Sequence, residues 1–137
     1  MNMLSACQDS TAEYDGSCYY FDTSKKEHAS ATSSCSNYGF HLVFIGSQEE
    51  QDFIQTYMAD TNMEDCWIGL TLIPTGEPVW LDGSSLTYRN FDNNSINEGG
   101  ECFRIVPSYG YTWHDRGCLY NFSFICEKEI GEYFIFS

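Results

Sequence analysis

The sequence predicts an α+β domain in which two helices come first, short strands and long loops follow, and disulfides join them. Three observations lead to this fold class. Two capping-box patterns stand in the first half of the chain, and the second precedes an amphipathic segment. After Asp65, short apolar or aromatic runs alternate with Gly, Pro, Asn and Asp, which is typical of strands and loops. Seven cysteines in 137 residues predict disulfides and an oxidising compartment.

The first expected elements are a strand and a helix. Residues 18–21, Cys-Tyr-Tyr-Phe, form a short aromatic run that predicts a strand. Ser24 followed by Glu27 is a capping box, and it predicts a helix that runs to about Asn37 and ends at Gly39. We expect Cys35 of this helix to face the core.

A second helix is predicted to begin after the capping box formed by Ser47 and Glu50. Its apolar residues recur at the spacing of one helix face, and they are Phe53, Ile54, Tyr57 and Met58. The predicted strands after Asp65 are residues 67–70, 79–81, 102–106, 111–113 and 123–127. Residues 88–101 form a polar stretch with little to pack, and a loop of this length inside a domain is usually functional.

The composition fits one domain over residues 1–137, because the chain is 42% hydrophobic and 17% aromatic. No apolar stretch reaches the roughly 18 residues that a membrane-spanning helix needs, so no membrane span is expected. The net charge of −14 disfavours nucleic acid, anionic lipid and polyanionic polysaccharide as partners, unless a cation such as a divalent metal intervenes. An acidic surface also keeps secreted proteins soluble. We expect a secreted, extracellular protein.

Several motifs occur along the chain in a fixed order. They are Gly39 and Leu42 after Cys35, Trp67-Ile68-Gly69-Leu70, Trp80-Leu81-Asp82-Gly83-Ser84, Cys102 and Cys118 on either side of Trp113-His114-Asp115, and Phe124-Ile125-Cys126-Glu127. With these motifs, residues 7–128 resemble a C-type lectin domain in its long form, which has an N-terminal disulfide hairpin. The resemblance implies two helices, small antiparallel sheets and a long ligand-binding loop. It also implies a ligand-binding role.

The number of cysteines leaves their pairing open, and the resemblance implies one answer. Its pairs are Cys7 with Cys18, Cys35 with Cys126, and Cys102 with Cys118. Cys66 is then left over, either as a buried free thiol or as an interchain disulfide in a homodimer. The apolar tail, residues 129–137, would either add a strand beside the N-terminal strand or bury against a second copy of the chain.

Sugar-binding members of the family hold a calcium ion in the long loop. Their ligands are a Glu-Pro-Asn or Gln-Pro-Asp tripeptide, an acid before the third conserved cysteine, and an Asn-Asp pair after a tryptophan. The matching positions here are Ser95-Ile96-Asn97, Glu101 and His114-Asp115. The match is degenerate, since Ser95 replaces an acid or amide and His114 offers nitrogen where calcium prefers oxygen. Residues 71–76 carry no carboxylate, so we expect the family's auxiliary calcium site to be absent.

The remaining candidate metal donors suit calcium or zinc, because they combine one imidazole with several carboxylate and amide oxygens. They are Asn97, Glu98, Glu101, His114 and Asp115. In an alternative of equal weight, Glu101 and Asp115 hydrogen-bond the loop backbone and no metal binds. Exposed rings beside these donors could stack on a sugar, although Trp113 is expected in the core. The candidate ligand-binding residues are Ser95, Asn97, Glu101, Tyr109, Tyr111, His114 and Asp115.

No motif for a nucleophile, a zinc protease, a phosphate loop or a redox pair is present, so we do not expect an enzyme. His28 is expected on a solvated helix face and His41 against the backbone, and neither enters the candidate site. The predicted function is that of a carbohydrate-binding lectin, which recognises bacterial or fungal cell-surface glycans in innate defence through a metal-assisted loop. The alternative is a metal-independent protein-interaction module of the same fold. Asn93 and Asn121 begin glycosylation sequons, and a glycan on Asn93 would crowd the loop.

Overall fold

The computed structural model describes residues 7, 8 and 10–130. Its elements, in chain order, are β1 (Ala12–Tyr14), β2 (Ser17–Lys26), α1 (His28–Asn37), β3 (His41–Leu42), α2 (Gln48–Asp60), β4 (Cys66–Thr71), β5 (Val79–Trp80), β6 (Cys102–Val106), the 3-10 helix η1 (Pro107–Tyr109), β7 (Thr112–Arg116) and β8 (Phe122–Glu129). The predicted α+β order of two helices followed by most of the strands is confirmed. In the part of the chain that the structure describes, neither helix has the length and hydropathy that crossing a membrane requires.

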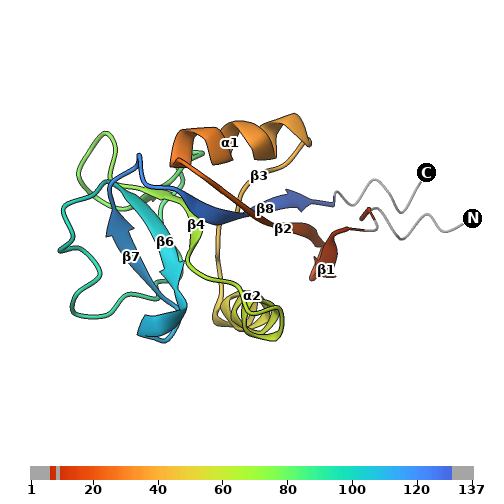
Figure 1. Ribbon diagram of the computed structural model, residues 1–137. Coiled ribbons are helices and arrows are strands. Elements are labelled where there is room, and N and C mark those ends of the chain that lie inside the picture. Colours follow the sequence, from red (N-terminus) through yellow and green to blue (C-terminus); the bar gives the residue numbers. More distant parts are fainter. Residues whose placement is uncertain (1–6, 9, 131–137) are drawn as a thin grey trace, which may run out of the picture.

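The strands form one mixed sheet, where the sequence predicted several small antiparallel ones. The order along the sheet is β1-β2-β8-β4-β6-β7, while β3 pairs with β8 and β5 pairs with β4. The β4 and β8 strands run parallel and join the two antiparallel halves. In Figure 1, α1 and α2 lie on opposite sides of the β2–β8 pair. The long loop before β6 lies at the other end of the sheet, beside β7.

The first predicted capping box does not form. Ser24 lies inside β2, and its hydroxyl donates to the carboxylate of Asp22 at 2.5 Å. The helix begins at His28 with Glu27 as its N-cap, and it has no side-chain cap. The reason is tertiary pairing, because β2 continues to Lys26, which pairs with Phe122 of β8. The predicted end at Asn37 and Gly39 is confirmed, since Gly39 adopts a left-handed φ of 78°.

The second capping box forms at the start of α2. The Ser47 side chain accepts a hydrogen bond from the backbone N–H of Glu50 at 3.1 Å. Glu50 in turn accepts from the N–H of Gly46 at 2.9 Å, one residue earlier than in the standard box. Ile54 and Met58 of the predicted apolar face are fully buried. This cap fixes where α2 begins and how it packs on the sheet.

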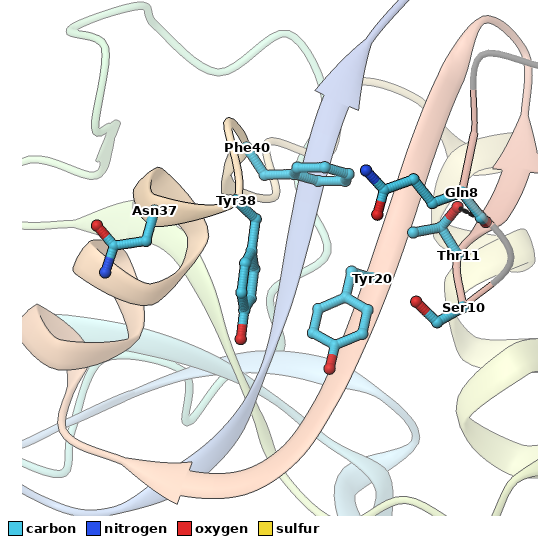
Figure 2. Close-up of a pocket in the computed structure, with 7 residues that line it drawn as sticks. All are labelled: Gln8, Ser10, Thr11, Tyr20, Asn37, Tyr38 and Phe40. Carbon is cyan, nitrogen blue, oxygen red and sulfur yellow. Dashed lines mark hydrogen bonds between the residues drawn. The ribbon is translucent and has the colours of Figure 1, made fainter.

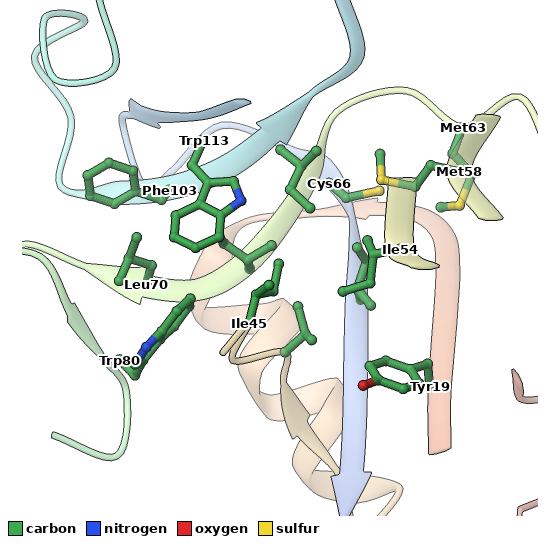
Figure 3. Close-up of a cluster of buried hydrophobic side chains, with 14 residues drawn as sticks. Tyr19, Ile45, Ile54, Met58, Met63, Cys66, Leu70, Trp80, Phe103 and Trp113 are labelled. Atoms are coloured by element: carbon green, nitrogen blue, oxygen red, sulfur yellow. The ribbon is translucent and has the colours of Figure 1, made fainter. Parts of the chain in front are cut away.

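The larger core cluster fills the space between α2, the sheet and the loop (Figure 3). Trp80, Phe103 and Trp113 lie together there, and the Trp80 and Trp113 ring centroids are 5.5 Å apart. Trp113 is completely buried, as predicted. Its indole N–H donates to the amide oxygen of Gln51 at 2.9 Å, which ties β7 to α2. The core therefore holds β7, and with it the base of the loop, in a fixed position.

All three predicted disulfides are present. They join Cys7 to Cys18, Cys35 to Cys126, and Cys102 to Cys118. Cys66 is a free thiol that is fully buried, and its Sγ contacts the carbonyl of Glu64 at 3.3 Å. Burial excludes the predicted alternative of an interchain disulfide at this cysteine. Of the tail at 129–137, residues 131–137 lie outside the described residues, so both predictions for it stay predictions.

The predicted environment of one histidine was wrong. His28 was expected on a solvated helix face, but only 5% of it is exposed. Its Nε2 lies 3.0 Å from the carbonyl oxygen of Ile68, and its ring meets Trp67 edge to face. Burial lowers the pKa of His28, so the ring is neutral at physiological pH. The cause of the misplacement is the start of α1 at His28 itself, which turns this first residue toward β4.

Candidate functional site

The long loop is organised by the carboxylate of Asp115 on β7. Asp115 is 1% exposed. Its Oδ1 accepts hydrogen bonds from the backbone N–H groups of Asn97 at 3.3 Å and Glu98 at 3.0 Å, and its Oδ2 accepts from Gly100 at 3.1 Å. Three amide donors on one carboxylate fix the loop around it. Asp115 therefore holds the loop backbone by hydrogen bonds, which is its role in the predicted alternative without metal.

Ser95, a predicted ligand-binding residue, is a second structural residue of the loop. Only 2% of it is exposed. Its hydroxyl oxygen accepts from the N–H of Asp92 at 2.8 Å, and its carbonyl accepts from the N–H of Asp115 at 2.8 Å. The side chain is therefore turned into the loop.

Glu98 lies between two guanidinium groups. Its Oε1 is 2.8 Å from Nη1 of Arg116 and 3.4 Å from Nη2 of Arg104. Arg104 is 5% exposed, and it also pairs with Asp65 at 3.0 Å and donates to the carbonyl of Asp115 at 2.8 Å. A carboxylate held by two cations has little negative charge left for a metal ion. Sequence reasoning missed both arginines, because neither belongs to the motif that the resemblance supplied.

His114 is as buried as Asp115, with 1% exposure. Its Nε2 lies 2.8 Å from the hydroxyl oxygen of Thr112 and 3.2 Å from Oδ2 of Asp92. Among the described residues its Nδ1 has no hydrogen-bond partner, and Oε2 of Glu98 is 3.8 Å away. Each ring nitrogen therefore faces a different acid, Asp92 at Nε2 and Glu98 at Nδ1. The ring and the two acids do not point their ligand atoms at one common metal position.

These side chains surround a hollow of about 420 Å³, which we call the loop hollow. Its lining residues are Asp92, Asn94, Asn97, Glu98, Tyr109 and His114. Tyr109 is 50% exposed, and its ring centroid is 4.7 Å from that of His114. The backbone N–H of Asn94 donates to Asp92 at 2.8 Å and lowers the pKa of that carboxyl, so Asp92 is ionised at neutral pH. The loop hollow therefore combines hydrogen-bond acceptors, hydrogen-bond donors and one exposed aromatic face.

Two of the lining residues were missed by the sequence prediction, Asp92 and Asn94. The sequence did hold a signal for them. An aspartate often accepts a hydrogen bond from the backbone N–H two residues later, and this forms an Asx turn. Besides Ser95 and Asp115, two further predicted residues do not line the loop hollow. Glu101 is exposed outside it, while its carbonyl accepts from the N–H of Leu72. The Tyr111 ring packs against the core, and its left-handed φ of 66° turns its carbonyl to Gln51.

The predicted loop donors do not form a divalent-cation site. In the described part of the chain, one group of three His, Cys, Asp or Glu side chains brings its ligand atoms within 4.8 Å of one another, and it consists of His41, Glu127 and Glu129. The loop set fails for a physical reason, since Asp115 is saturated by amides and Glu98 by arginines. An ion at this place would also face the charge of Arg104 and Arg116. The calcium or zinc ion that the resemblance implies does not fit these residues.

A second hollow, of about 370 Å³, lies between the end of α1, β2 and the described N-terminal residues. Figure 2 shows its lining residues, which are Gln8, Ser10, Thr11, Tyr20, Asn37, Tyr38 and Phe40. The rings of Tyr20 and Tyr38 meet edge to face with centroids 5.3 Å apart, and Tyr38 is 50% exposed. Sequence reasoning did not single out this place. It is remote from the loop hollow, at the end of the sheet where β1 and β2 lie in Figure 1.

Similar proteins were found both by sequence and by structure. The mouse low affinity immunoglobulin epsilon Fc receptor is 36% identical over 125 residues, which are 89% of this chain and 37% of that receptor. The carbohydrate-recognition domain of the mouse scavenger receptor C-type lectin gives a TM-score of 0.83 at 34% identity, over 91% of this chain and 98% of that one. A Ca²⁺-independent C-type lectin from Saxidomus purpuratus gives a TM-score of 0.81 at 26% identity, over 89% of this chain and 93% of that one.

Across five mammalian relatives, the chain spans between 37% and 62% of the full protein. The family model named Lectin C-type domain matches residues 24–128. That family is a non-enzymatic binding module, so the predicted absence of an enzymatic role agrees with it. The arrangement of two helices on one mixed sheet with three disulfides agrees as well. The chain belongs to the C-type lectin domain family.

Proposed function

We propose that this domain binds a carbohydrate directly in the loop hollow, without a bridging metal ion. The observation that carries the proposal is the mixture of groups around one open space of about 420 Å³. Sugar hydroxyls both donate and accept, so a site for them needs both kinds of partner. The carboxylates of Asp92 and Glu98 accept, and the amides of Asn94 and Asn97 do either. The Tyr109 ring offers an apolar face on which the CH groups of a sugar can stack.

The comparisons support a metal-independent mode of binding. The lectin from Saxidomus purpuratus is described as Ca²⁺-independent, and it shares this fold at a TM-score of 0.81. The two arginines beside Glu98 balance part of the acidic charge of the loop without a metal ion. A neutral or basic sugar suits the acidic chain better than a polyanionic one, because the net charge is −14.

We also propose secretion and a microbial ligand source. Three disulfides in a small domain support an oxidising, extracellular location. Glycans of bacterial or fungal cell surfaces, recognised in innate defence, are the ligands to test first. A homodimer remains a prediction that rests on the tail, since Cys66 is buried.

A glycan array probed in chelator, and again with added calcium or zinc, tests the proposal. We expect binding that chelator does not reduce. Tyr109→Ala should weaken binding to the array hit about two- to tenfold, because stacking on an aromatic ring contributes about 0.5 to 1.5 kcal/mol. Tyr38→Ala is the matched control, since both tyrosines are 50% exposed and Tyr38 lies in the other hollow. Equal loss in both variants, or binding that requires calcium, would overturn the proposal.

A protein-interaction module is the second candidate function. The observation that favours it is the hollow of Figure 2, where three aromatic rings and several polar side chains lie together on an open surface. Aromatic residues are enriched in protein interfaces. The name of the mouse relative refers to an immunoglobulin ligand of that protein. Absence of binding to every glycan of the array, with and without metal, would move the assignment to this candidate.

A further inference from the structure

Three metal-ligating side chains meet on one face of the sheet, far from the loop hollow. His41 on β3 pairs across the strands with Glu127 on β8. Glu129 follows two residues later on β8, and alternation along a strand therefore directs it to the same face as Glu127. One ligand atom from each of the three residues lies within 4.8 Å of the others. We call this group the β3–β8 cluster.

The His41 ring is fixed in the orientation that metal ligands need. Its Nδ1 lies 2.6 Å from the carbonyl oxygen of Leu42, so this nitrogen carries the proton that it donates. Its Nε2 lies 2.9 and 3.0 Å from the two carboxylate oxygens of Glu129, and a metal ion between them would take the place of the Nε2 proton of this ion pair. Metal-bound histidines commonly donate their other N–H to a carbonyl in this way. Stacking on Phe44, with centroids 4.2 Å apart, also holds the ring.

The cluster carries more negative charge than its neighbours balance. Glu127 is 4% exposed, and its oxygens accept from the Ser17 hydroxyl at 2.8 Å and the Phe44 N–H at 3.2 Å. In the described chain, neither Glu127 nor Glu129 forms a salt bridge with lysine or arginine. The carboxylates of Glu127 and Glu129 lie on the same face, with ligand atoms within 4.8 Å of each other, and so repel each other. A bound cation would remove this repulsion.

We propose that His41, Glu127 and Glu129 bind a zinc ion. Zinc takes four ligands at about 2.0 to 2.2 Å, which places tetrahedral donors about 3.3 Å apart. The contacts between His41 and Glu129 are already close to that separation. The side chains of His41 and Glu129 are 32% and 61% exposed, which leaves room for water as the fourth ligand. Calcium fits poorly, because it prefers six to eight oxygen ligands.

Zinc at this place would add a cross-link between β3 and β8. The β3 strand has two residues, and its register with β8 consists of the pairs His41 with Glu127 and Leu42 with Cys126. The ion would bind the folded chain and not the unfolded one, so it would raise stability. This proposal does not depend on carbohydrate binding in the loop hollow, and either proposal can fail alone.

Calorimetric titration of the chelator-treated protein with zinc tests the proposal. We expect one equivalent to bind, with a rise in the thermal unfolding midpoint. His41→Gln and Glu129→Gln should each weaken zinc binding about tenfold or more, since each removes a ligand. Glu77→Gln is the matched control, because it removes the same charge from an exposed loop position. Asp92→Asn is the second control, and it separates this cluster from the loop hollow.

Both test variants change partly exposed side chains, so they are expected to fold, and circular dichroism checks this. Cobalt in place of zinc should give the visible absorption of a tetrahedral site with nitrogen and oxygen ligands. Absence of saturable zinc binding would overturn the proposal, and so would equal zinc affinity in wild type and both test variants. In either case His41 and Glu129 form only an ion pair. Calcium binding as strong as zinc binding would also overturn it.

Discussion

Asp115 determines at the residue scale what the long loop can bind. The resemblance marks this position as a metal ligand, but its carboxylate accepts three backbone N–H groups and is 1% exposed. The sequence identified the residue and could not identify its partners, because backbone amides carry no sequence signal. The same limit applies to Glu98, whose two arginines come from β6 and β7. Only the register of these strands brings them to one carboxylate.

Histidine environments show a related limit. His41 was set aside because a lone histidine at a strand start usually packs or meets the backbone, and it does meet the Leu42 carbonyl. Its second nitrogen, however, meets a glutamate that is 88 residues away in the sequence. The motif Phe124-Ile125-Cys126-Glu127 was used for recognition only. Its glutamate is buried near two other acids, and this could not be read from the motif.

Glu127 supplies a prediction about stability and pH. Its pKa is about 7 in the folded protein, whereas an ordinary glutamate has a pKa of 4.5, so the folded form binds the proton more tightly than the unfolded chain does. This group therefore stabilises the fold below about pH 4.5, and that contribution is lost as pH rises through about 7. In the Glu127→Gln variant, the free energy of unfolding should fall less between pH 5 and pH 8 than it does in the wild type.

Urea denaturation at both pH values, in chelator so that no metal contributes, measures this effect. Glu77→Gln serves as the control, since that side chain is exposed and should leave the pH dependence unchanged. A Glu127→Gln variant whose stability falls with pH as steeply as that of the wild type would show that Glu127 ionises normally in the folded state.

At the element scale, the two capping boxes had the same sequence pattern and different outcomes. Ser47 caps α2, whereas Ser24 lies in β2. Local pattern predicts a cap, but β2 pairs with β8 up to Asp22 and again at Lys26, so Ser24 is held in the strand, within an irregularity of the register, and this pairing takes precedence over the cap. Strand positions after Asp65 were predicted well, because short aromatic runs between turn residues have few alternatives. The joining of the strands into one sheet required the parallel β4–β8 pair, which no local pattern encodes.

The difference between the two serines can be measured. Ser47→Ala should lower the free energy of unfolding by about 1 kcal/mol, because it removes the acceptor of the Glu50 N–H. Ser24→Ala should cost less than about 0.5 kcal/mol, since it removes one exposed hydroxyl contact with Asp22. Chemical denaturation of both variants tests this. A larger loss for Ser24→Ala than for Ser47→Ala would mean that the first box does cap α1.

At the scale of the whole molecule, the domain has two candidate functional ends joined by the sheet. The loop hollow lies beside β7, and the β3–β8 cluster lies on the opposite half of the sheet, where β8 pairs with β2 (Figure 1). The resemblance predicted the first end in outline, because its motifs fall around Cys102 and Cys118. It predicted nothing of the second end, since the cluster combines residues from two distant parts of the sequence with no shared motif. Both ends belong to one sheet that the three disulfides cross-link, so function at each end depends on the same covalent frame.

The three disulfides should contribute unequally to that frame. Cys35 and Cys126 are separated by 91 residues, whereas Cys102 and Cys118 are separated by 16. A longer loop restricts the unfolded chain more, so the chain-entropy model gives about 4.6 kcal/mol for the first disulfide and about 3 kcal/mol for the second. Replacing Cys35 and Cys126 together by alanine should therefore destabilise the domain more than replacing Cys102 and Cys118 together.

Chemical denaturation of the two double variants measures the difference, with Cys66→Ala as the control for loss of a buried sulfur without loss of a cross-link. The Cys102 and Cys118 variant should also lose glycan affinity, because this disulfide joins β6 to the segment after β7 and so supports the base of the loop hollow. The Cys35 and Cys126 variant, where it still folds, should keep that affinity, since its disulfide joins α1 to β8 on the other side of the sheet. Equal loss of affinity in both variants would show that the two ends are coupled through the core, and that the loop hollow depends on the stability of the whole domain rather than on its local frame.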